Sequence, residues 1–232
     1  MPFILFIEIK MKIKSIIVVV LLFFFYWLVI PYICGSIWGV ISIWYYLMDI
    51  IVTLSYVTFY VISLLLLFFL YKKTEVDFAF QSSNNDSEKM SFFKLFLVAV
   101  FFQSITIIYK FLSNQISNTQ EIECQIDSVF IVRIIVALVL APIVEELFYR
   151  KWMISYLEKS KVKPYFVLFM TSILFFIAHT NYVNWTFQLD AFFFGIMQYF
   201  IYKKSFDVRY CIWVHFINNI IATSTNIAFH YF

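Results

Sequence analysis

The sequence predicts an all-α protein: a polytopic bundle of about seven transmembrane helices with a cytoplasmic N-terminus. Of the 232 residues, 63% are hydrophobic and only 13% are charged, whereas soluble domains carry about 25% charged residues. A soluble chain of this length would need far more polar surface. Aromatic residues make up 23% of the chain, which excludes a disordered chain. The net charge of +3 is too small to predict a nucleic-acid partner.

Apolar runs that can cross the hydrocarbon core alternate with charged breaks along the chain. The predicted helices span residues 15–34, 42–70, 92–112, 128–157, 164–181, 187–202 and 208–229. The first run is longer than a signal-peptide core and lacks a small-residue cleavage site, so we expect it to be retained as a helix. Cys34, Cys124 and Cys211 are odd in number and form no C-x-x-C pair. This pattern argues against a disulfide framework and a zinc ribbon.

The positions of the cations predict the orientation of the bundle. They precede the first helix or fall in every second loop, at Lys10, Lys12, Lys14, Lys72, Lys73, Lys89, Lys94, Lys151, Lys159, Lys161, Lys163, Lys203, Lys204 and Arg209. The opposite loops, 35–41, 113–127 and 182–186, contain no Lys or Arg. The positive-inside rule therefore places the N-terminus inside and the C-terminus outside. Abundant Phe, Ile, Lys and Asn indicate an AT-rich bacterial genome, so we expect a bacterial plasma membrane location.

Ionisable side chains inside the predicted helices mark candidate functional positions, because each costs about 2.5–3.5 kcal/mol at membrane depth. Asp49 and Arg133 have no evident partner and are interpreted as structural. The others form three patterns on three helices: Glu145-Glu146-x-x-x-Arg150, Phe175-x-x-x-His179 and His215-x-x-x-Asn219. The spacing of Glu146 and Arg150 favours an ion pair on one helix face. Glu145 is rotated by about 100° around the helix axis from Glu146, so it needs a different partner.

Each pattern by itself also has a structural explanation. Glu145, Glu146 and Arg150 can mark a helix end at the cytoplasmic interface, His179 an interfacial histidine, and His215 a core residue. If the fourth helix ended near Arg150, Glu145 would lie only about 7 Å deep and would not meet His179. If that helix continues to Glu158, Glu145 lies about 20 Å deep. We prefer the deeper placement, because it pairs a buried Arg150 with Glu146. Pro142 predicts a disturbed turn.

The ordered trio of patterns resembles the signature of the CAAX protease and bacteriocin-processing (CPBP, or Abi) family of intramembrane proteases. The resemblance covers about residues 128–225. It divides one integral bundle into variable N-terminal helices, 1–127, and catalytic helices, 128–232. It implies an endopeptidase that acts on a membrane-associated peptide or protein within the lipid bilayer. The segment 203–209, with its Lys and Arg residues, departs from the small-residue turn that relatives often carry there.

Peptide hydrolysis needs an activated water and a stabilised oxyanion, and the candidate residues can supply both. We expect Glu145 to be the general base and His179 to hold the water, which are the roles that the resemblance implies. His215 and Asn219 are the expected oxyanion donors. Glu146 and Arg150 would orient the fourth helix.

We expect no metal or other cofactor, because H-E-x-x-H is absent and a metal-free glutamate mechanism fits the residues. The alternative is a Zn²⁺ ion held by Glu145, His179 and His215 as a His₂Glu site. Two other functions stay open. One is a non-catalytic bacteriocin self-immunity or regulatory membrane protein. The other is a small transporter lined by Asp49, Glu145 and Arg150, which the absence of two-half symmetry disfavours.

Overall fold

The computed structural model describes residues 2–34, 48–76, 89–112, 128–179 and 185–231. Within these residues the chain forms seven continuous helices and no β-strand, which confirms the predicted fold class. The cytoplasmic placement of the N-terminus stays a prediction. The predicted loops 35–41 and 113–127, with Cys124, and the predicted start of the second helix lie outside the described residues.

The first, second and third helices come from the N-terminal part of the chain. Helix α1 (Pro2–Phe24) continues through a π-helical segment, η1 (Phe25–Val29), to Cys34. Helix α3 spans Met48–Thr74 and α4 spans Phe92–Leu112. The first helix thus begins earlier than predicted. The second extends to Thr74, which places Lys72 and Lys73 in its last turn.

The fourth helix is one continuous rod of alternating α- and π-helical segments. Its segments are α5 (Ser128–Ile135), η3 (Val136–Leu140), α6 (Ala141–Glu146), η4 (Leu147–Ile154) and α7 (Ser155–Lys159). We call this rod the central helix. Segment η3 ends two residues before Pro142, consistent with the disturbed turn that a missing N–H predicts. The central helix continues nine residues beyond Arg150, which agrees with the deeper placement of Glu145 along the helix.

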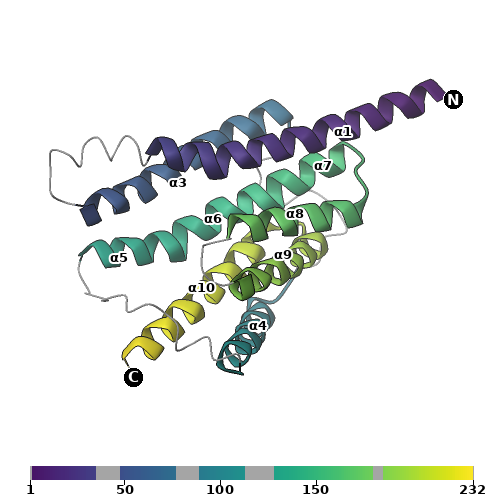
Figure 1. Ribbon diagram of the computed structural model, residues 1–232. Helices are drawn as coiled ribbons and strands as arrows, with labels where there is room; N and C mark the ends of the chain where they lie inside the picture. The colour runs from purple at the N-terminus through teal and green to yellow at the C-terminus, as the bar shows by residue number, and fades with distance from the viewer. Residues whose placement is uncertain (1, 35–47, 77–88, 113–127, 180–184, 232) are drawn as a thin grey trace.

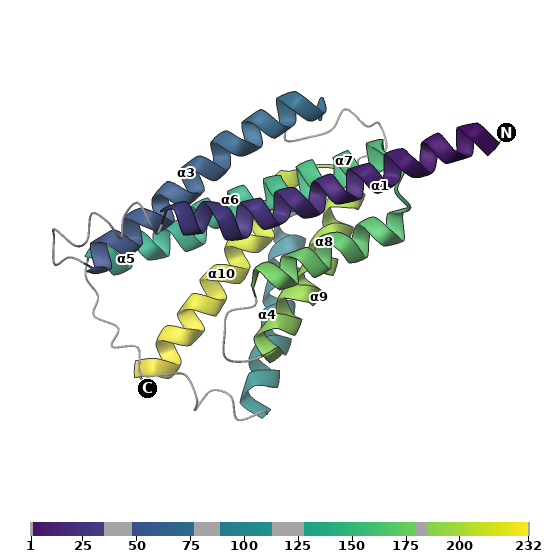
Figure 2. The same cartoon turned by 45° about the horizontal axis from the view of Figure 1, so that its top comes forward.

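Three helices complete the bundle: α8 (Pro164–Ala178), α9 (Trp185–Ser205) and α10 (Val208–Tyr231). Pro164 opens α8 at a position where the missing N–H costs no hydrogen bond. Helix α9 packs along α8, and α4 packs along α10. Figures 1 and 2 show α1 and α3 on one side of the central helix and α4, α8 and α9 on the other. The central helix is therefore enclosed, and every residue of η4 is buried.

The structure places several of the predicted loop cations within helices. Lys94 lies in α4, Lys159 ends α7, and Lys203 and Lys204 lie in the last turn of α9, all near helix ends. Lys151 is the clearest correction, because it is only 3% exposed and lies within η4. It is a residue of the helix and not of a loop.

The surface of the bundle suits a lipid environment. Three described helical stretches are long and apolar enough to cross a membrane: Ile9–Cys34, Thr53–Thr74 and Phe92–Tyr109. Large apolar side chains point outward from them, among them Leu21, Leu65 and Phe101. Contiguous apolar surface of this kind is the expected lipid-facing face of a membrane helix. The structure therefore supports an integral membrane protein.

Candidate active site

The central helix carries a fully buried ion pair. Arg150 Nε lies 3.0 Å from Glu146 Oε2, and neither side chain has any exposed surface. The guanidinium carbon of Arg150 also lies 5.1 Å from the centre of the Phe175 ring, a cation–π distance. The predicted pairing of these two residues on one helix face is thus present, and the alternative of an exposed Arg150 at the interface is wrong.

Glu146 also receives a histidine from another helix. His215 Nδ1 lies 2.8 Å from Glu146 Oε1, and both groups are buried. A carboxylate only accepts hydrogen bonds, so the imidazole Nδ1–H donates to it. Glu146 therefore links α10 to the central helix while it neutralises Arg150. The predicted role of Glu146 was to orient the central helix and fix the charge around Glu145, without a contact to His215.

Glu145 faces the other histidine. His179 Nε2 lies 3.7 Å from Glu145 Oε2, which is beyond hydrogen-bond distance. His179 caps the end of α8, and its Nδ1 lies 2.8 Å from the carbonyl oxygen of Phe175. Because a carbonyl only accepts, Nδ1 carries a proton, and Nε2 is an acceptor in the neutral ring. With the ring neutral, Nε2 and Glu145 Oε2 are two acceptors that face each other across the gap.

Asn219 and its neighbour Asn218 make different contacts. Asn219 Nδ2 donates to the carbonyl oxygen of Ala137 in η3, at 2.9 Å. Asn218 Oδ1 accepts a hydrogen bond of 2.6 Å from Gln103 Nε2 on α4. Helix α4 thereby joins the site, although no residue of this helix was predicted to do so. Gln103 was detectable only as one of the few polar residues in a predicted transmembrane helix.

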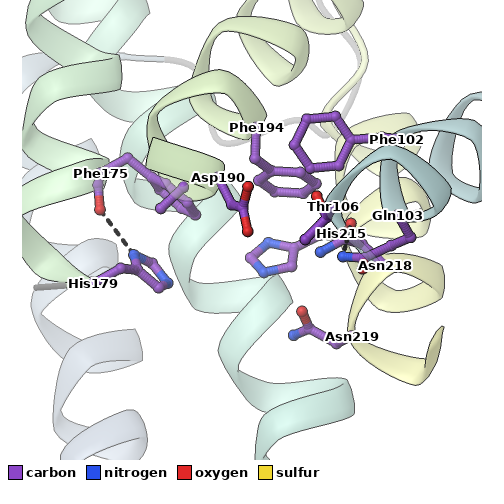
Figure 3. A pocket seen from close by; sticks show the side chains of 11 residues that line it. Phe102, Gln103, Thr106, Phe175, His179, Asp190, Phe194, His215, Asn218 and Asn219 are labelled. Atoms are coloured by element: carbon purple, nitrogen blue, oxygen red, sulfur yellow. Dashed lines mark hydrogen bonds between the residues drawn. The ribbon is translucent and has the colours of Figure 1, made fainter. Parts of the chain in front are cut away.

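A cavity of about 140 Å³ lies beside the two histidines, between α4, α8, α9 and α10 (Figure 3). It is lined by Phe102, Gln103, Thr106, Phe175, His179, Asp190, Ala191, Phe194, His215, Asn218 and Asn219. Three predicted site residues, His179, His215 and Asn219, therefore share one cavity. Glu145 is not among the lining residues and approaches the site through His179. Glu146 and Arg150 are not lining residues either, and Glu146 reaches the cavity through its contact with His215.

Glu145 lies in a region of the bundle that contains buried donors from η1 and the central helix. Tyr26 Oη, Trp27 Nε1 and Tyr149 Oη make no hydrogen bond within the described part of the chain, and neither does Glu145 Oε2. The Trp27 ring centre lies 6.4 Å from that of His179 and 6.5 Å from that of Tyr149. Nothing in an apolar run of Phe, Tyr and Trp residues could have singled out Tyr26 or Trp27.

The alternative zinc site stays a prediction. In the described ranges, no group of three His, Cys, Asp or Glu side chains is arranged to hold one metal ion. Glu145 lies beside His179 and Glu146 contacts His215. In both rings the hydrogen bond is made by Nδ1.

Comparison with known proteins identifies one matching family. Residues 127–221 match the family model described as type II CAAX prenyl endopeptidase Rce1-like. No curated protein and no solved structure matches the chain. The matched segment contains all three sequence patterns, and it confirms the predicted resemblance. It supports peptidase activity and a membrane location in general. The division of the chain into residues 1–127 and 128–232 stays a prediction.

Proposed function

From the match of residues 127–221 to the Rce1-like type II CAAX prenyl endopeptidases, we propose that the protein is an intramembrane endopeptidase. It hydrolyses a peptide bond of a membrane-associated peptide or protein. The observation that supports this most is the arrangement of Glu145 and His179, whose acceptor atoms face each other at 3.7 Å. His179 also lines the cavity that His215 and Asn219 share.

In the proposed reaction, a water donates one hydrogen to Glu145 Oε2 and the other to His179 Nε2. Its oxygen attacks the carbonyl carbon of the scissile peptide, and Glu145 accepts the proton. The tetrahedral intermediate then expels the amine, and the proton held by Glu145 passes to the leaving nitrogen. The products are a carboxylic acid and an amine, so no other reactant is needed.

The oxyanion of that intermediate needs hydrogen-bond donors, and His215 and Asn219 are the proposed ones. Asn219 Nδ2 uses one hydrogen for Ala137, which leaves a second N–H. His215 Nδ1 is engaged by Glu146, so His215 donates from Nε2 only as the imidazolium. Glu146 is then a positioning residue that holds the imidazolium in place.

The test compares the N-terminal peptides of membrane proteins from cells that express wild-type, Glu145→Gln or His179→Ala protein. We expect a set of new N-termini in the wild-type membranes that disappears with either substitution. Glu158→Gln is the matched control, because Glu158 pairs with Lys203 away from the cavity. It removes a carboxylate while leaving cleavage intact. Thermal unfolding of each purified variant checks that the fold is retained.

Cleavage that persists with Glu145→Gln would remove Glu145 from the mechanism. A cellular phenotype that persists with both substitutions, without any processed peptide, would instead favour the non-catalytic immunity or regulatory role.

A further inference from the structure

Helix α4 presents a polar face to the cavity beside the histidines. Gln103 and Thr106 line this cavity and are only 6% and 4% exposed. They lie three residues apart, so they share one side of the helix. The opposite side carries Phe101, Ile105 and Ile108, which are exposed and suit contact with lipid. Polar side chains buried in a membrane helix are costly unless a partner or a ligand uses them.

The hydrogen bond between Gln103 and Asn218 uses only part of what the two amides offer. Gln103 Nε2 donates to Asn218 Oδ1 at 2.6 Å, and Figure 3 shows the pair in the wall of the cavity. A carboxamide has one acceptor oxygen and two N–H donors. Within the described residues, this is the one hydrogen bond that either side chain makes. Gln103 Oε1 and both hydrogens of Asn218 Nδ2 are therefore available to a molecule in the cavity.

Neither the family match nor the proposed reaction gives this pair a role. Helix α4, which carries Gln103, precedes the matched residues 127–221. Asn218 is the sequence neighbour of Asn219, the proposed oxyanion donor, and makes a different contact. Both members of the pair line the cavity that His215 and Asn219 share. A group held by the pair would therefore lie close to the carbonyl that the water attacks.

A peptide that is cut inside a membrane has main-chain groups that need partners. The chain must leave its helical conformation to expose the cleaved bond, which frees N–H and C=O groups where little water can reach them. In an extended chain, the N–H and the C=O of one residue point to the same side, as in an antiparallel ladder. An acceptor next to a donor is the complement of such a residue.

We propose that Gln103 and Asn218 bind the main chain of one extended substrate residue next to the cleaved bond. Gln103 Oε1 accepts from its N–H, and Asn218 Nδ2 donates to its C=O. That this chain is a substrate rests on the proposed function. The size fits, because the cavity has a volume of about 140 Å³, and a cavity of about 150 Å³ admits benzene. The main-chain atoms of one residue occupy less space than a benzene ring.

The probe for this site is 2-pyrrolidinone, a lactam whose N–H and C=O lie on the same side. Its matched ligand is γ-butyrolactone, which has the same shape and an oxygen in place of the N–H. Binding to the full-length protein in lipid nanodiscs is measured by ligand-detected NMR, with empty nanodiscs to correct for uptake into lipid. We expect the lactam to bind about fivefold more tightly, the scale of one net hydrogen bond. An apolar cavity would prefer the lactone, because the lactam gives up more hydrogen bonds to water.

Three variants assign the preference to the amide pair. Gln103→Leu removes the acceptor and should abolish or reverse the preference for the lactam. The double exchange of Gln103→Asn with Asn218→Gln keeps an amide pair and should retain part of the preference. Ser104→Ala is the matched control on the same helix and should leave the preference intact, because the Ser104 hydroxyl is exposed and bonds to the carbonyl oxygen of Val100. Thermal unfolding checks that each variant is folded.

Two results would overturn the site. One is a lactone that binds to the wild-type protein as tightly as the lactam, and the other is a lactam preference that survives Gln103→Leu. A further variant locates the probe: Ala191 lines the cavity, so the larger side chain of Ala191→Phe should block the lactam. Unchanged lactam binding to Ala191→Phe would place the probe elsewhere and contradict the proposal.

Backbone esters link the site to the reaction. A peptide that the wild-type protein cleaves is synthesised with each amide N–H beside the cut replaced in turn by an ester oxygen. One replacement should raise KM about fivefold and leave kcat unchanged, because the contact is the same in the ground state and the transition state. In Gln103→Leu, KM should already be raised for the all-amide peptide, and the same ester should raise it no further. An ester that raises KM equally in both proteins would contradict the contact.

The two proposals fail in different ways. Selective lactam binding without any cleavage would contradict the proposed function and leave the amide site standing. Cleavage that no ester weakens, together with equal binding of the lactam and the lactone, would contradict the amide site alone.

Discussion

Removing the guanidinium from the buried Glu146–Arg150 pair should be one of the most destabilising single changes in this protein. Both side chains have no exposed surface and are joined at 3.0 Å. In Arg150→Met, the linear side chain keeps part of the packing, and Glu146 retains only His215 as a partner. Breaking a buried pair by removing one partner costs about 3–5 kcal/mol. The lost cation–π contact with Phe175 adds to that cost.

A double-mutant cycle separates the charge from the packing. Glu146→Gln combined with Arg150→Met leaves no unpaired charge between these two positions. We therefore expect the double variant to lose less unfolding free energy than the sum of the two single variants, by about 1–3 kcal/mol. Lys159 and Glu75 provide an internal control, because their side chains are 52% and 84% exposed. Lys159→Met should cost no more than about 1 kcal/mol.

The assay is reversible unfolding of each purified variant in mixed micelles, followed by tryptophan fluorescence as the denaturing detergent is increased. A loss of under about 1 kcal/mol for Arg150→Met, similar to the exposed control, would refute the reasoning. Strict additivity in the cycle would also refute it, because it would show that the two charges do not interact.

Four further predictions concern the contacts around the site. Gln103→Leu removes the 2.6 Å hydrogen bond to Asn218 and should lower the unfolding free energy by about 1–3 kcal/mol. The double exchange of Gln103→Asn with Asn218→Gln should recover part of that loss. An unchanged unfolding free energy in the Gln103→Leu variant would contradict the contact. Gly195→Ala places a Cβ 3.1 Å from the Cα of Ser172. The resulting overpacking of α8 against α9 should lower the unfolding free energy by about 1–3 kcal/mol, measured by thermal unfolding. An unchanged unfolding temperature would mean that α8 and α9 can move apart without cost. Tyr149→Phe removes a buried hydroxyl that has no hydrogen-bond partner among the described residues, so stability should stay within about 0.5 kcal/mol or rise. A large loss would reveal a partner for that hydroxyl. Exhaustive chelation should leave cleavage unchanged, because the proposed mechanism activates the water with Glu145 and His179 alone. Activity that is lost and then restored by Zn²⁺ would overturn the metal-free mechanism.

Several features were predictable because they depend on short stretches of chain. The length of an apolar run determines whether a helix can cross a bilayer, so seven helices could be predicted from hydropathy and charged breaks. The Glu146–Arg150 pair was predictable for a similar reason, since residues four apart lie on one face of any α-helix. The trio of patterns also carried the family resemblance, because it depends only on residue order and spacing.

Other features depend on how the helices are rotated and shifted against one another. Whether His215 reaches Glu145 or Glu146 is decided by the rotation of α10 around the central helix, and the structure places it on Glu146. Gln103 and Asp190 enter the cavity only because α4 and α9 pack beside α10 and α8. Spacing within one helix is fixed by backbone geometry, which the sequence reveals directly. Contacts between helices arise from side-chain packing over the whole bundle, and only the tertiary structure decides them.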